Sequence, residues 1–80
     1  VPYPQELRNV HVEHKIPFEE NAEIADAVAR IEEGLEGRGR VLLRYSGTEA
    51  LCRVMVEGQD ADKVRVYANE LAGIVEKALG

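Results

Sequence analysis

Two short apolar runs near the middle of the chain constrain its fold more than any other feature. The runs are RVLLRY, residues 40–45, and LCRVMV, residues 51–56. Their β-branched and aromatic residues favour strands. Only SGTEA, residues 46–50, connects them, and this connection is too short for the crossover helix that parallel strands need. The sequence therefore predicts an antiparallel strand pair joined by a tight loop.

Helical patterns lie on both sides of this strand pair. Apolar residues recur at steps of three and four over residues 22–35 and 64–79, which is the spacing of helices with one buried face. Asn21 and Asp60 precede these stretches, where their side chains are expected to cap the first-turn N–H groups. The glycine-rich GLEGRG, residues 34–39, is expected to end the first helix in a left-handed conformation.

The N-terminal part of the chain adds one more strand. Val10 and Val12 alternate with polar residues over residues 7–14, as in a strand with one buried face. Residues 1–6 contain two prolines and are expected to be a linker or domain boundary. Residues 7–80 are then one domain in the order βαββα. This order predicts an α+β two-layer sandwich, with two helices on one face of a small antiparallel sheet.

The composition agrees with one small globular domain that could fold alone. With 80 residues, 45% hydrophobic content, one Phe and no Trp, the core must consist mostly of Val, Leu, Ile and Ala. One cysteine cannot form an internal disulfide, and no secretion leader or long apolar segment is visible. These features predict a cytoplasmic protein with no membrane partner.

The charge distribution bears on the kind of ligand. The net charge of −5 and the few aromatic residues argue against a nucleic-acid partner. Four arginines nevertheless fall within residues 38–53, namely Arg38, Arg40, Arg44 and Arg53. Such a local basic region suits one small anion.

Two groups of side chains resemble metal ligands but have structural explanations. His11, Glu13 and His14 include zinc-type donors, yet on a strand His11 and His14 would point to opposite faces. Asp60 and Asp62 lack a third acid at the right spacing, and helix capping accounts for both. No metal site is therefore predicted.

Cys52 and Ser46 are the candidate nucleophiles. Cys52 shares a strand face with Val54 and Val56, which indicates a small buried hydrophobe. Ser46 lacks the glycine two residues upstream that builds a nucleophile elbow. No catalytic residue is predicted in this chain.

The loop RYSGT, residues 44–48, suits a phosphate group instead. A tight turn at Gly47 can direct backbone N–H groups at an anion, and Ser46 and Thr48 add hydroxyl donors. Arg44 adds a planar guanidinium that matches two phosphate oxygens at once. The alternative is a plain hairpin turn in which Ser46 and Thr48 bond only their own backbone.

Arg53 is harder to place from the sequence. If Tyr45 and Leu51 close the loop as a pair, Arg44 lies opposite Cys52, and Arg53 points to the other side of the sheet. Both arginines could then reach one phosphate only through a bulge or a bent side chain. Arg44 is the firmer candidate on this reasoning.

The stretch RYSGTEALCRVMVEG, residues 44–58, resembles the phosphate-binding loop in the last domain of the α-D-phosphohexomutase superfamily. RVLLR and RVMVEG look most like the bacterial phosphoglucosamine mutases of that superfamily. The resemblance extends more weakly over nearly the whole chain and implies a TATA-binding-protein-like fold. It also implies a parent enzyme that interconverts glucosamine 6-phosphate and glucosamine 1-phosphate through a bisphosphorylated sugar.

By this resemblance the domain binds the substrate phosphate that is not being transferred. The residues carried over by the motif are Arg44, Ser46, Gly47 and Thr48, with Arg53 as a weaker assignment. The phosphoserine and Mg²⁺ of the parent enzyme belong to its other domains, which are the expected partners together with the phosphosugar. This domain alone is therefore expected to be inactive.

Two positions in the motif need separate treatment. Glu49 carries a carboxylate that repels phosphate, so it is assigned to bracing of the loop or to contact with another domain. The family usually has proline where this sequence has Ala50, which is expected to loosen the exit of the loop.

Two other functions remain open at this point. The parent could act on glucose or mannose phosphates, as phosphoglucomutases and phosphomannomutases of the superfamily do. Alternatively, the chain could be an interaction module that binds protein through its helices or sheet and does not respond to phosphate.

Overall fold

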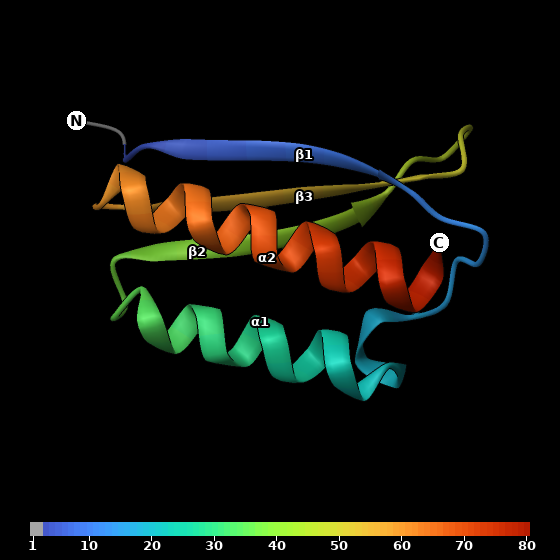
Figure 1. The fold of residues 1–80 in the computed structure, drawn as a ribbon, viewed down its shortest axis with the longest axis horizontal. Coiled ribbons are helices and arrows are strands. Elements are labelled where there is room, and N and C mark those ends of the chain that lie inside the picture. Colours follow the sequence, from blue (N-terminus) through green and yellow to red (C-terminus); the bar gives the residue numbers. More distant parts are fainter. Residues whose placement is uncertain (1–2) are drawn as a thin grey trace.

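The computed structural model describes residues 3–80 (Figure 1). The three strands, a short 3-10 helix (η1) and the two helices follow the order β1, η1, α1, β2, β3, α2. Their bounds are β1 Gln5–His11, η1 Phe18–Glu20, α1 Ala22–Gly34, β2 Gly39–Tyr45, β3 Leu51–Gly58 and α2 Ala61–Leu79.

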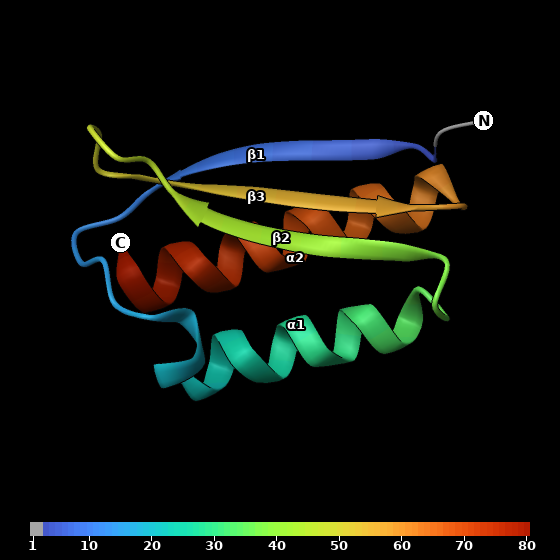
Figure 2. The same cartoon turned by 180° about the vertical axis from the view of Figure 1, so that it is seen from behind.

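The sheet has the order β1-β3-β2, and both neighbouring pairs are antiparallel. Both helices lie on one side of this sheet, and the view from behind shows its other side uncovered (Figures 1 and 2). The predicted α+β sandwich with two helices on one face is confirmed. Among residues 3–80, no helix has the length and apolar character needed to cross a membrane.

The helix ends form where the sequence predicts them. The Asn21 side chain accepts a hydrogen bond from the Ile24 N–H at 3.0 Å and caps α1. Asp60 caps α2 by accepting from the backbone N–H groups at positions 62 and 63. After α1 the chain enters the left-handed region at Glu36 and Gly37, with φ of 55° and 73°. The glycine-rich stretch does end the helix, although only one of these two left-handed residues is a glycine.

The core lies between the sheet and the helices. Side chains alternate along β3, so Cys52, Val54 and Val56 face the helices, and each is 0% exposed. This confirms Cys52 as a small buried residue. The helices supply equally buried side chains, chiefly Ile24, Ile31, Val64, Leu71 and Val75. Burial of a large aliphatic side chain contributes about 1.5–3 kcal/mol, so this layer contact is the main source of stability.

The uncovered face of the sheet carries an apolar row across all three strands. Leu7, Met55 and Leu42 are opposite one another in the register of β1, β3 and β2. Met55 is 7% exposed because its neighbours cover it, whereas Leu7 and Leu42 remain 66% and 42% exposed. The row thus leaves an apolar surface next to the basic end of the sheet.

The first strand differs in its limits from the expected residues 7–14. Of the predicted linker, residues 1–2 lie outside the described residues, while Gln5 and Glu6 belong to β1. The strand ends at His11. The Val12 N–H still bonds the Ala50 carbonyl next to β3, but the N–H groups of Glu13 and His14 donate to Leu79 in α2 instead. His14 therefore lies outside the strand. The argument that strand alternation would point His11 and His14 to opposite faces was wrong, because only His11 belongs to β1.

A tight contact between β2 and β3 makes the fold sensitive at Gly39. A Cβ added there would overlap the Glu57 carbonyl oxygen and lie 2.9 Å from Gly58 Cα. We therefore expect Gly39→Ala to lower the free energy of unfolding by about 1–3 kcal/mol. Gly73→Ala, in α2 with open space around it, should raise that energy by about 0.5–1 kcal/mol. Urea unfolding of both variants measures the difference, and equal effects would contradict this packing.

Candidate anion-binding site

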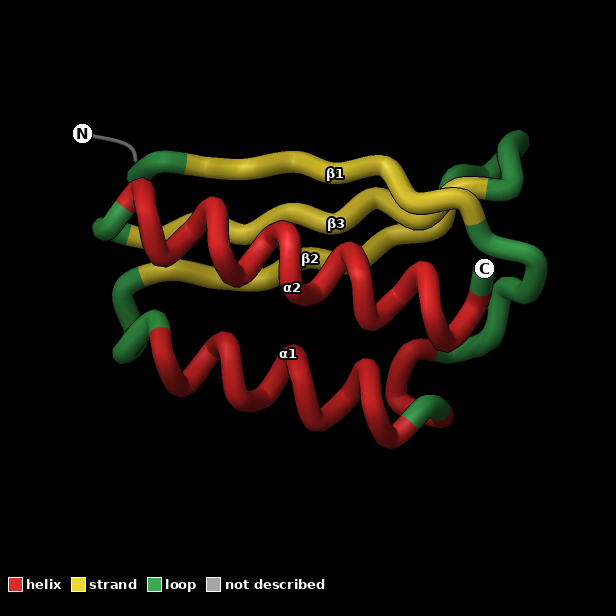
Figure 3. Tube along the Cα trace, viewed as in Figure 1, coloured by secondary structure: helices red, strands yellow, loops and turns green. Residues whose placement is uncertain are grey.

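The predicted site residues come together at the end of the β2–β3 hairpin. A depression of about 300 Å³ is lined by Arg44, Tyr45, Ser46, Gly47, Thr48 and Arg53. All five residues assigned to phosphate binding from the sequence are in this set. The loop that carries them extends beyond the end of the sheet, away from both helices (Figure 3).

The strand register corrects the sequence-based placement of Arg53. Tyr45 lies opposite Cys52, not Leu51, and the loop closes through the Ser46 N–H, which donates to the Leu51 carbonyl at 2.9 Å. This register places Arg44 directly opposite Arg53. Both arginines are therefore on the uncovered face of the sheet, and neither a bulge nor a bent side chain is needed to bring them together.

Neither of these two arginines has a carboxylate partner among residues 3–80. Glu57, an acid on the same face, is instead 3.7 Å from Arg40 and accepts a hydrogen bond from Gln5. Like charges directly opposite in a sheet are destabilising by about 0.2–1 kcal/mol. A bound anion would replace this repulsion with two attractions.

Several backbone N–H groups of the loop are already bonded within the loop and are not free for an anion, although the sequence predicts donors there. Ser46 Oγ accepts from the Glu49 N–H at 3.1 Å and from the Thr48 N–H at 3.4 Å. Within the loop, the N–H groups of Gly47 and Ala50 have no acceptor in the described part of the chain. The serine hydroxyl thus engages two of the backbone donors that the sequence offered to an anion, and two others keep no internal acceptor among the described residues.

This arrangement still provides donors for an anion. A hydroxyl that accepts two hydrogen bonds has its own proton left to donate, so Ser46 can donate outward. The Thr48 hydroxyl and the Gly47 N–H are further donors, and the two guanidinium groups lie beside them. Ser46 therefore does bond its own backbone, as the plain hairpin interpretation predicts. The groups that could donate to an anion nevertheless remain available.

Tyr45 and Cys52, the sequence neighbours of the two arginines, point to the covered side of the sheet. Burial raises the pKa of the Tyr45 hydroxyl, although its hydrogen bond to the Ile16 carbonyl acts in the opposite direction. The hydroxyl thus stays protonated at neutral pH. Burial likewise raises the pKa of the Cys52 thiol, which disfavours the reactive thiolate.

One contact of the site was missed by sequence reasoning. The Lys15 ammonium donates a hydrogen bond to the Ser46 carbonyl at 2.7 Å. Lys15 is 31 residues away and lies in no periodic pattern, so no local signal identifies it. Tyr45 was also missed as a lining residue, although an aromatic side chain beside Arg44 at a strand end could have been noticed.

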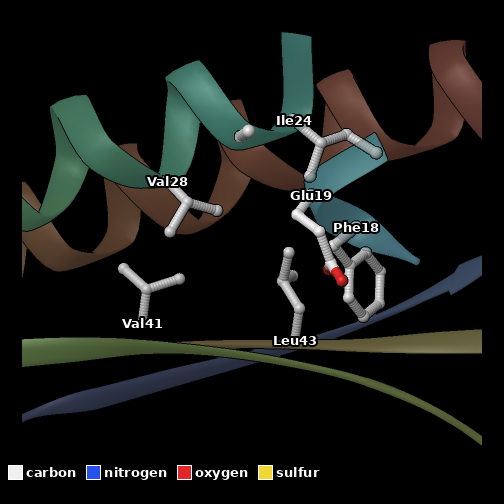
Figure 4. A pocket seen from close by; sticks show the side chains of 7 residues that line it. Phe18, Glu19, Ile24, Val28, Val41 and Leu43 are labelled. Carbon is white, nitrogen blue, oxygen red and sulfur yellow. The ribbon is translucent and has the colours of Figure 1, made fainter. Parts of the chain in front are cut away.

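Two other features stand apart from this site. An apolar cleft of about 320 Å³ lies between α1 and β2, where Val28, Val41, Leu43 and Phe18 face one another (Figure 4). Its only charged lining residue is Glu19, so it does not suit an anion. Across residues 3–80, no three His, Cys, Asp or Glu side chains come together as metal ligands.

Comparison with known proteins gives the family. The model of the phosphoglucomutase/phosphomannomutase C-terminal domain matches residues 7–74, which includes the whole candidate site. The chain belongs to the phosphoglucomutase/phosphomannomutase family. The resemblance found in the RYSGT loop is thus confirmed, and the matching family model is that of the C-terminal domain.

Relatives within the phosphoglucomutase/phosphomannomutase family are much longer than this chain. It is 64% identical over 78 residues to a phosphoglucosamine mutase of Desulfovibrio desulfuricans, covering 98% of the chain and 17% of the relative. A phosphoglucosamine mutase of Nitratidesulfovibrio vulgaris is 61% identical over 77 residues, with 96% and 17% covered. The chain therefore spans about a sixth of the length of these relatives.

One solved structure has a similar fold, and at this level of identity the similarity bears only on the fold. The N-acetylphosphoglucosamine mutase of Aspergillus fumigatus, in complex with GlcNAc-6P and magnesium, is similar to this chain with a TM-score of 0.69. The identity is 24%, and the match covers 98% of this chain and 16% of the other.

The opposed arginines predict an unusual response to mutation. Arg53→Gln should stabilise the ligand-free chain by a few tenths of a kcal/mol up to about 1 kcal/mol at low salt, because it removes the repulsion. The gain should shrink in about 1 M salt, where the Debye length is short. Arg40→Gln is the matched control, since it changes the net charge equally but breaks the contact with Glu57. Urea unfolding at both salt concentrations tests this, and a gain that is independent of salt would refute it.

Proposed function

We propose that this chain is the substrate-phosphate-binding C-terminal domain of a phosphoglucosamine mutase. Such an enzyme interconverts glucosamine 6-phosphate and glucosamine 1-phosphate. The observation that carries the proposal is the placement of Arg44 directly opposite Arg53, with no carboxylate partner for either among residues 3–80. The names of the relatives at 64% and 61% identity support the choice of sugar.

In this proposal the site binds a phosphate group and breaks no covalent bond. Arg44 and Arg53 offer planar forks that match phosphate oxygens, and the Ser46 hydroxyl and Gly47 N–H complete the set of donors. Each charge-assisted hydrogen bond contributes about 1.5–3 kcal/mol. Two or three of them exceed the association cost by enough for a dissociation constant of about 1 mM. Weak binding of this kind suits a group that must be released when the sugar turns.

In this proposal the domain positions one end of the substrate while the other end reacts. The sugar carries a phosphate at each end during the cycle and must turn around between two phosphoryl transfers. Holding the phosphate that is not transferred orients the reacting end and helps to exclude water. The remaining domains of the parent chain are thus the partners of this one.

The groups that perform the chemistry belong elsewhere in the parent enzyme. We assign the phosphoserine and Mg²⁺ to other domains on the basis of the family resemblance, because the serine loop and the run of aspartates that hold them in the family have no counterpart in this sequence. A free, buried Cys52 suits a reducing compartment, and we place the parent enzyme in the cytoplasm.

Two alternatives can be separated from this proposal. A parent that acts on glucose or mannose phosphates would bind the phosphate through the same residues. The choice of sugar would depend mainly on contacts from other domains. A protein-interaction module is favoured by the exposed Leu7 and Leu42 beside Met55, which form an apolar row on the open face. Such a module would not respond to phosphate.

A titration of the ¹⁵N-labelled chain distinguishes phosphate binding from protein interaction. Inorganic phosphate or glucosamine 6-phosphate should shift the amide signals of residues 44–49 selectively, with a midpoint of about 1–10 mM. Arg44→Ala should abolish these shifts, whereas Arg40→Ala, on the same strand and face, should retain them. Unchanged signals at tens of millimolar ligand, roughly ten times that midpoint, would favour the interaction module.

Kinetics of the full-length parent enzyme test the role in catalysis. We expect Arg44→Ala to lower kcat/KM by about 30- to 150-fold, which corresponds to a loss of about 2–3 kcal/mol of transition-state stabilisation. Arg40→Ala serves as the control for loss of one positive charge. If Arg44→Ala changes kcat/KM by less than about threefold, Arg44 does not contact the substrate.

A further inference from the structure

A second segment of the chain holds the phosphate loop from its covered side. This segment, residues 12–18, follows β1 and includes the start of η1. Val12 donates its N–H to the carbonyl of Ala50 at the exit of the loop, at 2.9 Å. Lys15 donates to the Ser46 carbonyl at the entrance, at 2.7 Å. Both ends of the loop are thus tied to one short stretch of chain.

Tyr45 strengthens the attachment at the loop entrance. Its hydroxyl donates to the Ile16 carbonyl at 2.5 Å, and its ring stacks on Phe18 with the centroids 4.4 Å apart and an interplanar angle of 19°. Stacked aromatic pairs contribute specific geometry beyond the area that they bury. The residue between Arg44 and Ser46 is therefore held in place by residues 16 and 18.

The same segment is fixed to the helical layer. The N–H groups of Glu13 and His14 both donate to the Leu79 carbonyl near the end of α2, at 2.6 and 3.3 Å. The last carbonyls of a helix otherwise lack partners, so these bonds satisfy α2 and hold residues 12–18 against it. Hydrogen bonds therefore run from α2 through this segment to the loop.

The Lys15 contact acts on a peptide unit that belongs to the site. The Ser46 carbonyl and the Gly47 N–H are parts of one planar trans peptide, so they point in opposite directions. When the carbonyl points at Lys15, the N–H must point away from Lys15. A hydrogen bond to the carbonyl also polarises the peptide and strengthens its N–H as a donor. That N–H has no acceptor within residues 3–80, and Gly47 lines the depression, whereas Ala50, whose N–H also lacks an acceptor there, does not.

From this geometry we infer that Lys15 is a positioning residue of the phosphate site, which acts through the Ser46–Gly47 peptide. It orients the Gly47 N–H toward the bound anion, and residues 12–18 connect the loop to the end of α2. The inference rests on the proposed function for its ligand but not for the contact itself. Lys15 does not line the depression, so its role differs from that of Arg44 and Arg53.

Three variants of the ¹⁵N-labelled full chain test the inference. Lys15→Met removes the donor and keeps an unbranched side chain, whereas Lys15→Arg retains a positively charged donor. Lys63→Met is the control for loss of charge, because Lys63 lies in the first turn of α2, far from the loop (Figure 1). Two measurements are made for each variant, the Gly47 N–H order parameter without ligand and the dissociation constant for inorganic phosphate.

Lys15→Met should lower the Gly47 order parameter from the rigid range near about 0.85 toward the flexible range below about 0.6. It should also weaken phosphate binding by about 3- to 10-fold, the effect of one lost hydrogen bond. Lys15→Arg should restore affinity to within about twofold, and Lys63→Met should change neither quantity beyond that limit.

Other outcomes overturn specific parts of the argument. Weaker binding in Lys15→Met with an unchanged Gly47 order parameter would show that Lys15 contributes only charge, which refutes the positioning role. An unchanged order parameter together with unchanged affinity refutes it as well. If the unmodified chain fails to bind phosphate, the proposed function is wrong. The order parameter measured without ligand then still decides whether Lys15 fixes the Ser46–Gly47 peptide.

Discussion

The register between β2 and β3 is the constraint on which the rest of the structure depends. It places Tyr45 opposite Cys52, and therefore Arg44 opposite Arg53. A shift of one residue would send every side chain of one strand to the other face. The core would then lose its row of buried valines, and the two arginines would separate. One choice of register thus determines both the stability of the sheet and the charge of the candidate site.

Because side chains alternate along a strand, the hairpin presents different residues on its two faces. Arg44 and Arg53 extend from the uncovered face, where no acid among residues 3–80 neutralises them. Tyr45 and Cys52 extend from the covered face, where burial raises the pKa of both groups and keeps them protonated. Neighbouring residues on the same strand therefore anchor the hairpin and present its charge. Tyr45 is hydrogen-bonded and stacked, and Cys52 is buried, so the strand pair holds the two arginines opposite each other despite their repulsion.

The loop gains its order from Ser46 and not from the proline that the family usually has. Ser46 uses its N–H, carbonyl and hydroxyl in four hydrogen bonds, to Leu51, Lys15, Thr48 and Glu49. Two of these bonds engage the N–H groups of Thr48 and Glu49, and they leave those of Gly47 and Ala50 without an acceptor among residues 3–80. The exit is held as well, since the Ala50 carbonyl accepts from Val12. Restraint from a distant segment thus opposes the loosening that Ala50 alone would cause.

The sequence by itself determined the elements and the residue types of the site. Apolar spacing and the side chains of Asn21 and Asp60 are local signals, so they located the helices, and a five-residue connection required an antiparallel hairpin. The RYSGT motif likewise pointed to Arg44, Ser46, Gly47 and Thr48 as a phosphate loop. Only the tertiary structure decided that Arg53 joins Arg44 on one face and that Lys15 holds the Ser46 carbonyl. Register depends on how all three strands pack against the helices, and the Lys15 contact spans 31 residues, so neither is encoded in any short window of the chain.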